Sequence, residues 1–148
     1  MPPVRELFAL HGLRCTRQRE AVYTALRGTK KHPTPEQLHT LVKQTDAAIS
    51  LATVYNTLDA LCDAGLCRRF ATESGASGAS VYRYDADIED HAHLETADGR
   101  LLDLPQALDD ELQDAIPAEL LRRIEYATGV KIDRVTLRLI ESDEKRAS

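Results

Sequence analysis

Two histidines separated by one residue, His91 and His93, lie within an acidic stretch of the sequence, Tyr82–Asp103. In an extended segment, side chains two positions apart point to the same face, so both imidazoles can reach one metal ion. The carboxylates that could supply oxygen ligands nearby are Asp85, Glu89, Asp90, Glu95 and Asp103. The stretch therefore predicts a metal site with imidazole and carboxylate donors.

A third imidazole can come from a distant part of the chain. His32, followed by Pro33, lies in an exposed connection between two expected helices, while Asp85 and Asp103 lie at the ends of two expected strands. Together with His91 and His93 they give three nitrogen and two oxygen donors, a thiolate-free set that suits Fe²⁺ or Mn²⁺ better than structural zinc. More than four ligands favour a reversible, sensing role. The other two histidines, His11 and His39, are interpreted as solvated or capping residues.

The first half of the chain predicts four short helices. Residues 3–10 form a brief amphipathic segment, and Thr16 can cap a helix that runs to about Arg27. Thr34 to Gln37 reads Thr-Pro-Glu-Gln, a capping box with proline at the first helical position, and opens a helix to about residue 43. Ser50 can cap a fourth helix that ends at Gly65.

The fourth helix has one buried stripe and one free side. Leu51, Val54, Leu58 and Leu61 recur at helical spacing and predict the buried face. The remaining positions of its first turns carry small and hydrogen-bonding side chains, which suit entry into a DNA major groove. The candidate contacts there are Ser50, Ala52, Thr53, Tyr55 and Asn56.

Two alternating segments, 67–72 and 80–84, flank the Gly/Ser/Ala-rich ESGASGA and predict a β-hairpin. Three helices followed by a basic hairpin describe a winged helix-turn-helix, with Arg68, Arg69 and Arg83 available to the DNA backbone or minor groove. A purely structural hairpin is the alternative.

Beyond the acidic boundary at residues 85–90, a small α/β unit is expected. Residues 92–96 and 100–104 predict paired strands around Asp98-Gly99, residues 106–127 predict helices interrupted by Pro117, and residues 130–140 alternate as a strand. A unit of about sixty residues buries little core alone, so dimerisation through its sheet is expected. The fold class is α+β: a winged-helix domain at 1–84, a hinge at 85–90 and a dimerisation and metal-sensing domain at 91–148.

The charge distribution agrees with this division. Residues 1–84 hold 11 Lys/Arg against 7 Asp/Glu, a net +4, while residues 85–148 hold 8 against 17, a net −9. DNA contact by the first half only is consistent with that asymmetry. The chain has no apolar run long enough for a membrane span and no signal-peptide pattern, so a cytoplasmic protein is expected.

The three cysteines, Cys15, Cys62 and Cys67, form no CxxC pair and are interpreted as small core residues. The sequence lacks G-x-S-x-G, H-E-x-x-H, P-loop and G-x-G-x-x-G motifs, so catalysis is not expected. The alternative from the enzyme class is a metal-dependent hydrolase using His91, His93 and Asp103, which leaves the first half unexplained.

Six segments of the chain occur in the order and at the spacing seen in one known protein family: GLRCTRQREAV, KHPTPEQLH, ISLATVYNTLDALCDAGL, YRYD, DHAH and GRLLDL. With them, residues 5–105 resemble the ferric uptake regulator superfamily of bacterial metal-dependent transcription factors. The resemblance implies a homodimeric repressor that binds palindromic operator DNA, with no membrane partner. It also implies that the regulatory metal site falls on His32, Asp85, His91, His93 and Asp103, and that Arg17 touches the DNA backbone.

Aspartates at 85 and 103, and Asn56 after Tyr55, are more similar to the peroxide-responsive branch than to the iron-uptake branch. The resemblance then implies peroxide sensing through bound Fe²⁺, with His32 or His91 oxidised. Many relatives bind structural zinc through two CxxC pairs, which this chain lacks, so no structural zinc is expected and Zn²⁺ enters only as a substitute ion in purified protein. An iron- or haem-responsive regulator, as in the iron-uptake or Irr branches, remains the alternative.

Overall fold

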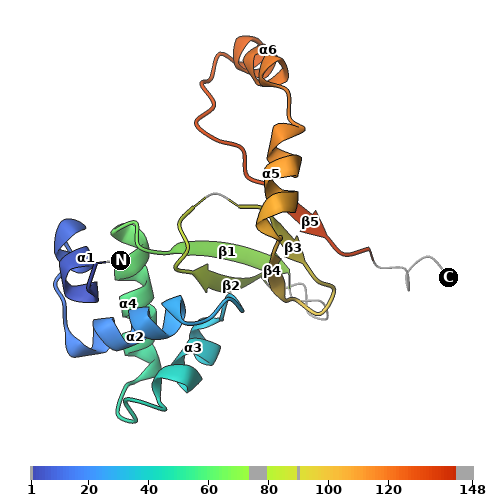
Figure 1. The fold of residues 1–148 in the computed structure, drawn as a ribbon. Coiled ribbons are helices and arrows are strands. Elements are labelled where there is room, and N and C mark those ends of the chain that lie inside the picture. Colours follow the sequence, from blue (N-terminus) through green and yellow to red (C-terminus); the bar gives the residue numbers. More distant parts are fainter. Residues whose placement is uncertain (1, 74–79, 90, 143–148) are drawn as a thin grey trace.

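The computed structural model describes residues 2–73, 80–89 and 91–142. Three features expected from the sequence fall partly or wholly outside these ranges: the ESGASGA tip of the hairpin, the carboxylate of Asp90 and most of the charged C-terminal tail. Figure 1 shows the N-terminal helices gathered at one end, the hairpin in the middle, and the small sheet with the C-terminal helices at the other end.

The N-terminal helices begin where their capping residues predict. They are α1 Val4–Leu10, α2 Arg17–Arg27, α3 Pro35–Val42 and α4 Leu51–Asp63. The side-chain oxygens of Thr16, Thr34 and Ser50 each accept a backbone N–H three residues on, and Thr34 forms the expected capping box with Gln37. After α4, Gly65 turns the chain with φ 75°, a left-handed conformation that glycine adopts without strain.

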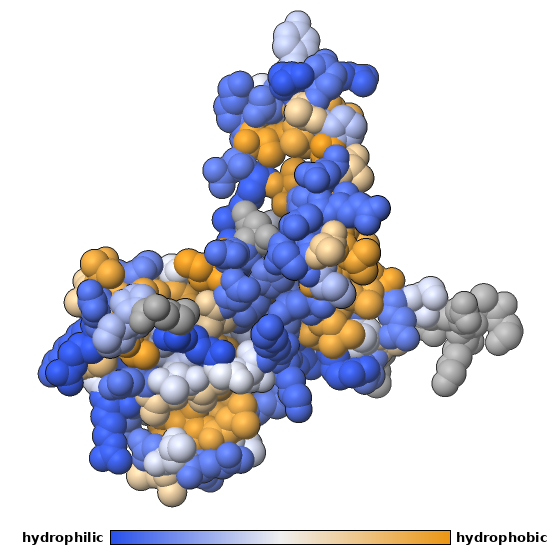
Figure 2. Space-filling model, viewed as in Figure 1, coloured by the Kyte–Doolittle hydropathy of each residue, from blue (hydrophilic) through white to orange (hydrophobic). Residues whose placement is uncertain are grey.

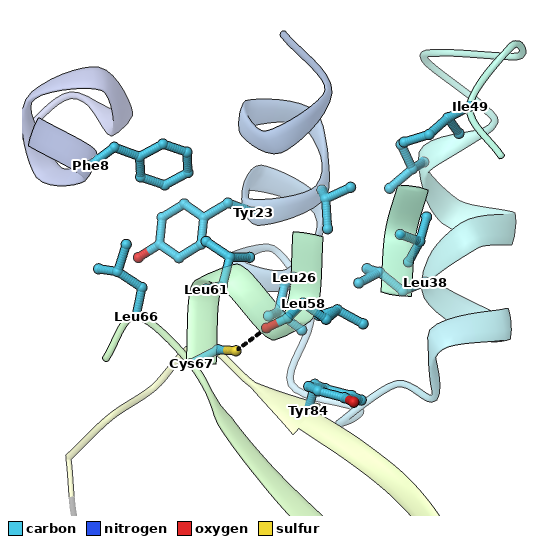
Figure 3. Packing of buried hydrophobic residues seen from close by; sticks show 13 residues of the cluster. Phe8, Tyr23, Leu26, Leu38, Ile49, Leu58, Leu61, Leu66, Cys67 and Tyr84 are labelled. Atoms are coloured by element: carbon cyan, nitrogen blue, oxygen red, sulfur yellow. Dashed lines mark hydrogen bonds between the residues drawn. The ribbon is translucent and has the colours of Figure 1, made fainter. Parts of the chain in front are cut away.

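These helices share one hydrophobic core (Figure 3). Phe8 of α1 packs edge-to-face on Tyr23 of α2, with ring centroids 5.3 Å apart. The predicted stripe on α4 is confirmed for Val54, Leu58 and Leu61, which are fully buried, whereas Leu51 is only half-buried. Removing the side chain of a fully buried leucine from such a core costs about 2–5 kcal/mol. The core therefore fixes the face that α4 turns outward.

The predicted hairpin consists of β1 Arg68–Glu73 and β2 Ser80–Asp85. The two strands pair antiparallel, with Arg68 opposite Asp85. Tyr84 of β2 is buried in the helical core, while Tyr82 is exposed. The hairpin is thus attached to the helices at its base.

The last third of the described chain contains a three-stranded sheet. Its elements are β3 His93–Glu95, β4 Leu101–Asp103, α5 Gln106–Asp114, α6 Ala118–Thr128 and β5 Arg138–Ile140. The strand order is β4-β3-β5, with β4 antiparallel and β5 parallel to β3. Gly99 has φ 84° at the predicted Asp98-Gly99 turn. The observed fold is α+β, as expected.

The strand predicted for residues 130–140 is much shorter in the structure, where only Arg138–Ile140 pair with β3. The reason is a pair of contacts to α6. Glu125 accepts the backbone N–H of Ile132 at 2.9 Å and lies 3.3 Å from Lys131 Nζ. These contacts hold the chain against α6 before it can reach the sheet.

Few apolar side chains are buried in this last third: among its described residues, Ala92 and Leu101 are the buried hydrophobic ones. Helix α6 contains no buried residue. Figure 2 shows apolar side chains exposed along the upright arm that holds α5 and α6. The large exposed hydrophobics of this region include Leu108, Leu120, Ile124, Tyr126, Val130, Leu139 and Ile140. Within the described residues, no helix is both long and apolar enough to cross a membrane.

Candidate metal centre and nucleic-acid interface

The structure brings together five side chains that the sequence places up to 71 positions apart. They offer one ligand atom each, and these atoms all lie within 4.8 Å of one another. The five residues are His32 from the α2–α3 connection, Asp85 at the end of β2, His91 just before β3, His93 at its start and Asp103 at the end of β4. They are the five side chains that the sequence proposes as metal ligands, and the structure shows that they cluster.

His32 is placed by its own backbone and by β2. Its φ of 49° lies in the left-handed region, which residues other than glycine seldom adopt. Because Pro33 follows it, the conformations open to His32 are restricted further. Two contacts hold this conformation: Arg83 Nη1 donates to the carbonyl of His32 at 3.1 Å, and the N–H of Tyr84 donates to the carbonyl of Pro33 at 3.1 Å. Strained backbone of this kind persists where the surroundings fix it, often at functional sites. Here it turns the imidazole toward Asp85.

Backbone carbonyls set the tautomers of two imidazoles. Nδ1 of His32 lies 2.7 Å from the carbonyl oxygen of Leu101, and Nδ1 of His91 lies 2.7 Å from that of Glu89. A carbonyl can only accept, so each Nδ1 carries the proton, and in the neutral ring Nε2 keeps a free lone pair. Metal-binding histidines are commonly fixed by such a bond, in which the ring nitrogen that does not bind the metal donates to a backbone oxygen.

The three Nε2 atoms converge on two carboxylate oxygens. Asp103 Oδ1 lies 3.0, 3.0 and 3.3 Å from Nε2 of His32, His91 and His93. Asp85 Oδ2 lies 3.1, 3.3 and 3.8 Å from the same three atoms. The other oxygen of Asp85 accepts the N–H of Asp87 at 2.8 Å, which leaves Oδ2 directed at the imidazoles.

This arrangement fits a divalent cation. Nε2 of His91 and Nε2 of His93 are buried and have no hydrogen-bond partner, a costly condition for polar atoms unless they bind something else. With neutral imidazoles the two carboxylates give the cluster a charge of −2, which a divalent ion cancels. Three nitrogens and two oxygens without sulfur are a donor set suited to Fe²⁺ or Mn²⁺.

The ionisation of the cluster reflects the same electrostatics. Burial lowers the pKa of His32, but its hydrogen bond to Asp85 and the charges of Asp103 and Asp85 outweigh this, so its pKa is raised. The pKa of His91 is also raised, because the Glu89 carbonyl and the nearby aspartates outweigh burial. Burial acts to raise the pKa of Asp85, but its contacts with His32 and His93 hold it well below the usual range. At a pH below these raised pKa values, a metal ion must displace protons held by His32 and His91.

The centre is enclosed on most sides. The sequence prediction that His32 lies in an exposed connection is wrong, because Arg83 and the Leu101 carbonyl hold its ring inside and its side chain is 1% exposed. The side chains of Asp85 and Asp103 are 9% and 30% exposed. A cavity of about 420 Å³ is lined by both aspartates together with residues of α1, α2 and the segment after β2. The cluster is thus open to solvent mainly beside Asp103.

Three neighbours of the site were not found from the sequence. Asp109 of α5 is buried, and its Oδ1 accepts the N–H of Ala92, between His91 and His93, at 3.1 Å. Phe70 of β1 packs edge-on against the ring of His93, with centroids 4.6 Å apart. Leu101 contributes only its carbonyl. Acidic residues are common in the first turn of a helix because they interact favourably with the helix dipole. The sequence therefore gives no sign that Asp109 has a role at the site.

The other carboxylates considered near His91 do not join the described cluster. Glu89 contributes its backbone carbonyl, and Glu95 is buried 3.4 Å from Arg138. Asp90 lies outside the described residues. The remaining histidines bind main-chain carbonyls at the two ends of α4. His39 Nε2 lies 2.9 Å from the carbonyl oxygen of Ile49, and His11 Nδ1 lies 2.9 Å from that of Ala64. Both contacts agree with the predicted capping role.

The outer face of α4 carries the candidate DNA contacts. Ala52, Tyr55 and Asn56 are exposed, Thr53 is half-exposed, and Ser50 caps the helix. Tyr55 donates its phenolic hydroxyl to Glu36 of α3 at 2.5 Å, which fixes the ring beside the first turn of α4. The hydrogen-bonding groups on this face thus lie close to a helix N-terminus, where DNA phosphates also bind favourably.

The basic candidates lie at different places. Arg17 is exposed in the first turn of α2, and the guanidinium of Arg69 covers the ring of Tyr82 at 4.6 Å. Arg68 is half-buried opposite Asp85 at the base of the hairpin. Arg83 is also half-buried and donates to His32 and Gln37 instead of extending from the hairpin.

A helix-turn-helix unit with a hairpin wing, joined to a small sheet by a five-donor cluster, is the arrangement of a metal-responsive DNA-binding regulator. The chain belongs to the ferric uptake regulator family, whose profile matches residues 10–138. It is therefore a metal-dependent transcriptional regulator and not an enzyme, and the hydrolase alternative has no support.

Individual relatives cover more than one branch. The chain is 31% identical over 118 residues to a ferric uptake regulation protein of Rhizobium leguminosarum bv. viciae, which covers 78% of this chain and 80% of that protein. It is 30% identical over 83 residues to the peroxide-responsive repressor PerR of Staphylococcus aureus, covering 56% of this chain and 53% of that repressor, so it spans about half the length of that relative. Among solved structures, a zinc-bound manganese uptake regulator matches with a TM-score of 0.63 and 28% identity, over 95% of this chain and 98% of that one.

Proposed function

We propose that this protein is a homodimeric repressor that binds a palindromic operator when Fe²⁺ or Mn²⁺ occupies His32, Asp85, His91, His93 and Asp103, and releases it on exposure to peroxide. The observation that carries this proposal is the convergence of five donors from both ends of the molecule within 4.8 Å. His32 and Asp85 belong to the helix-and-hairpin part, and the other three ligands belong to or adjoin the second sheet.

This division gives the site a role as a switch. We place the domain boundaries as the sequence suggests, with the DNA-binding domain at 1–84, a hinge at 85–90 and the dimerisation domain at 91–148. Ligands on both sides of residues 85–90 would fix the angle between the domains, and in a dimer this angle sets the spacing of the two α4 helices. Without the ion, DNA binding itself must fix the relative orientation of the domains, and this free-energy cost lowers the affinity for DNA.

The dimer is supported by the exposed apolar surface of the last third. Helix α6 buries none of its residues, and Leu120 and Ile124 are 43% and 41% exposed one helical turn apart. A second copy of the same surface is the partner that a closed two-fold contact would supply.

DNA contact is assigned to one face. The first turns of α4, with Ser50, Ala52, Thr53, Tyr55 and Asn56, enter the major groove. Arg17, Arg68 and Arg69 lie on basic parts of the same domain and are assigned to the phosphate backbone.

Peroxide sensing is the finer part of the proposal. Bound Fe²⁺ would supply the electrons that reduce a peroxide and direct the oxidation to a neighbouring side chain. The rings of His32 and His91 are held by their carbonyl bonds with Nε2 at the centre, so they are the expected targets. Oxidation of either ring removes a ligand and frees the domains. All three cysteines precede residue 68 and none forms a CxxC pair, which supports the absence of a structural zinc site.

The test uses DNA selected from a random pool by the Mn²⁺-loaded protein. The Fe²⁺ and Mn²⁺ forms are each bound to this DNA and treated with hydrogen peroxide without other oxidants. We expect peroxide to release the Fe²⁺ form only, with one added oxygen on His32 or His91 in the peptide mass spectrum. Retained DNA binding by the Fe²⁺ form would instead favour an iron- or haem-responsive regulator of the same family, and no metal-dependent DNA binding would reject the proposal altogether.

A further inference from the structure

Two cysteines outside the metal centre lie in contact at the end of α4. The sulfur atoms of Cys62, in the last turn of α4, and Cys67, just before β1, are 2.7 Å apart. A disulfide bond is about 2.05 Å long, so only a small approach separates the two thiols from a covalent bond. The left-handed turn at Gly65 folds the chain back and brings the two side chains together.

The two thiols have different surroundings. Cys62 is half-buried, whereas Cys67 is 5% exposed and belongs to the helical core. In Figure 3 the sulfur of Cys67 points at the carbonyl oxygen of Leu58, 3.8 Å away. Cys62 is therefore the thiol that a small molecule from solvent can reach more easily.

Their ionisation follows the same asymmetry. The S–H of Cys67 stabilises a thiolate at Cys62 and lowers its pKa; burial opposes this, and the charge of Arg69 adds to it. The pKa of Cys67 is raised, because a neighbouring thiolate and burial both disfavour a second negative charge. Cys62 is thus the thiol that ionises first.

We propose that Cys62 and Cys67 form a redox-active thiol pair that reacts with hydroperoxides, a site separate from the five-donor cluster. The Cys62 thiolate attacks the O–O bond, so that an S–O bond forms, the O–O bond breaks and an alcohol or water leaves with a proton. The sulfur of Cys67 then attacks the sulfenic sulfur of Cys62, and hydroxide leaves with the Cys67 proton as water. In total, the two thiols lose two protons and two electrons, and one hydroperoxide is reduced to an alcohol or water plus one further water.

Because the sulfurs are only 2.7 Å apart, a small approach of the two side chains is enough to form the disulfide. It joins the C-terminal turn of α4 to the first strand of the hairpin, while the exposed residues Ala52 and Tyr55 lie at the opposite end of the helix. The bond therefore stabilises the helical domain and prevents further oxidation of Cys62. This inference does not depend on metal binding or on peroxide sensing by the histidines.

The experiment treats the full-length, Mn²⁺-loaded protein with equimolar hydrogen peroxide, then unfolds it and alkylates it with iodoacetamide. Trypsin gives one peptide, residues 44–68, that contains both cysteines and no internal Lys or Arg, while Cys15 falls in a separate peptide. We expect peptide 44–68 to lose two hydrogens and take up no alkyl group, and dithiothreitol to restore two alkylation sites. The thermal unfolding midpoint of the oxidised protein should rise.

Variants separate the roles of the thiols. Cys62→Ser, at a half-buried position, should leave Cys67 reduced by the same treatment, and Cys67→Ser should allow Cys62 to accumulate as a sulfenic acid that dimedone traps. Cys15→Ser is the matched control and should form the disulfide like the unaltered chain. Two fully alkylated cysteines after peroxide, a sulfinic acid at Cys62 of the unaltered chain, a link to Cys15, or a lowered unfolding midpoint would each overturn the proposal.

Discussion

Nδ1 of His32 donates to the main-chain carbonyl of Leu101 across 69 positions of sequence, at 2.7 Å. This bond joins the connection between α2 and α3 to strand β4 of the second sheet, next to the ligand Asp103. The same ring has its Nε2 3.1 Å from Asp85 Oδ2, at the end of β2. One imidazole therefore contacts both the hairpin and the second sheet.

Removing one imidazole should disable the switch and leave the fold intact. His91 has an 11% exposed side chain and precedes β3, so His91→Ala removes a ligand with little loss of packing. We expect Mn²⁺-dependent DNA binding to be lost, measured by fluorescence anisotropy, while the dimer persists in analytical ultracentrifugation. His11→Ala, at a histidine outside the cluster, should bind DNA normally. Unchanged Mn²⁺-dependent binding by His91→Ala would exclude His91 from the centre.

Asp109 should act through the backbone between the ligands. Its carboxylate accepts the N–H of Ala92 in a buried position, so Asp109→Ala leaves that N–H unpaired and loosens both His91 and His93. Loss of such a supporting contact lowers metal affinity by about 10–100-fold, which isothermal titration with Mn²⁺ would measure. Asp109→Asn keeps an accepting oxygen and should retain most of the affinity. Equal losses in both variants would show that the negative charge matters more than the hydrogen bond.

Metal affinity should fall as the pH is lowered. The neighbouring aspartates and carbonyls raise the pKa values of His32 and His91, so these rings keep their protons to higher pH than free histidine and an ion must displace them. Below the raised pKa values each displaced proton weakens binding by about tenfold per pH unit. Mn²⁺ titrations from about pH 8 to about pH 5.5 should show this slope. A pH-independent affinity would contradict the assigned imidazole ligands.

Tyr55 should contribute to operator recognition directly. Its ring is 41% exposed, and its hydroxyl is donated to Glu36 in the free protein. If it contacts a base edge, Tyr55→Ala should weaken operator binding by about 1–3 kcal/mol and relax the sequence preference. Competition between selected and random DNA measures both effects. Glu36→Gln is the comparison, because it alters the hydrogen-bond partner of Tyr55 and keeps the Tyr55 ring. An equal loss of affinity for selected and random DNA in Tyr55→Ala would indicate that Tyr55 contacts the DNA backbone.

The apolar face of α6 should hold the dimer. Ile124→Asp places a charge on a side chain that is 41% exposed in the single chain and that contributes nothing to the helical core. We expect a monomer in sedimentation velocity, with the metal centre retained and operator affinity strongly reduced. Arg123→Ala, an exposed neighbour on the same helix, should remain dimeric. A dimeric Ile124→Asp protein would move the interface elsewhere.

The sequence predicted most helix starts because capping is local: Thr16, Thr34 and Ser50 each bond an amide three residues away. It also predicted the five clustered side chains, since the types and strand-end positions of His91, His93 and Asp103 suit a metal. It could not predict the length of β5, which depends on contacts from Glu125 to the segment after α6. Nor could it reveal Asp109 or the role of Arg83, whose partners are main-chain atoms of distant segments.

The uneven exposure of the five ligands has a kinetic consequence. His32, His93 and Asp85 have side chains 1%, 6% and 9% exposed, whereas that of Asp103 is 30% exposed and borders the cavity of about 420 Å³. In the proposed metal centre, an incoming ion would therefore meet Asp103 first and leave past it last. The opening of that single carboxylate would then govern how fast the protein follows a change in metal supply, while the buried imidazoles would govern the strength of binding.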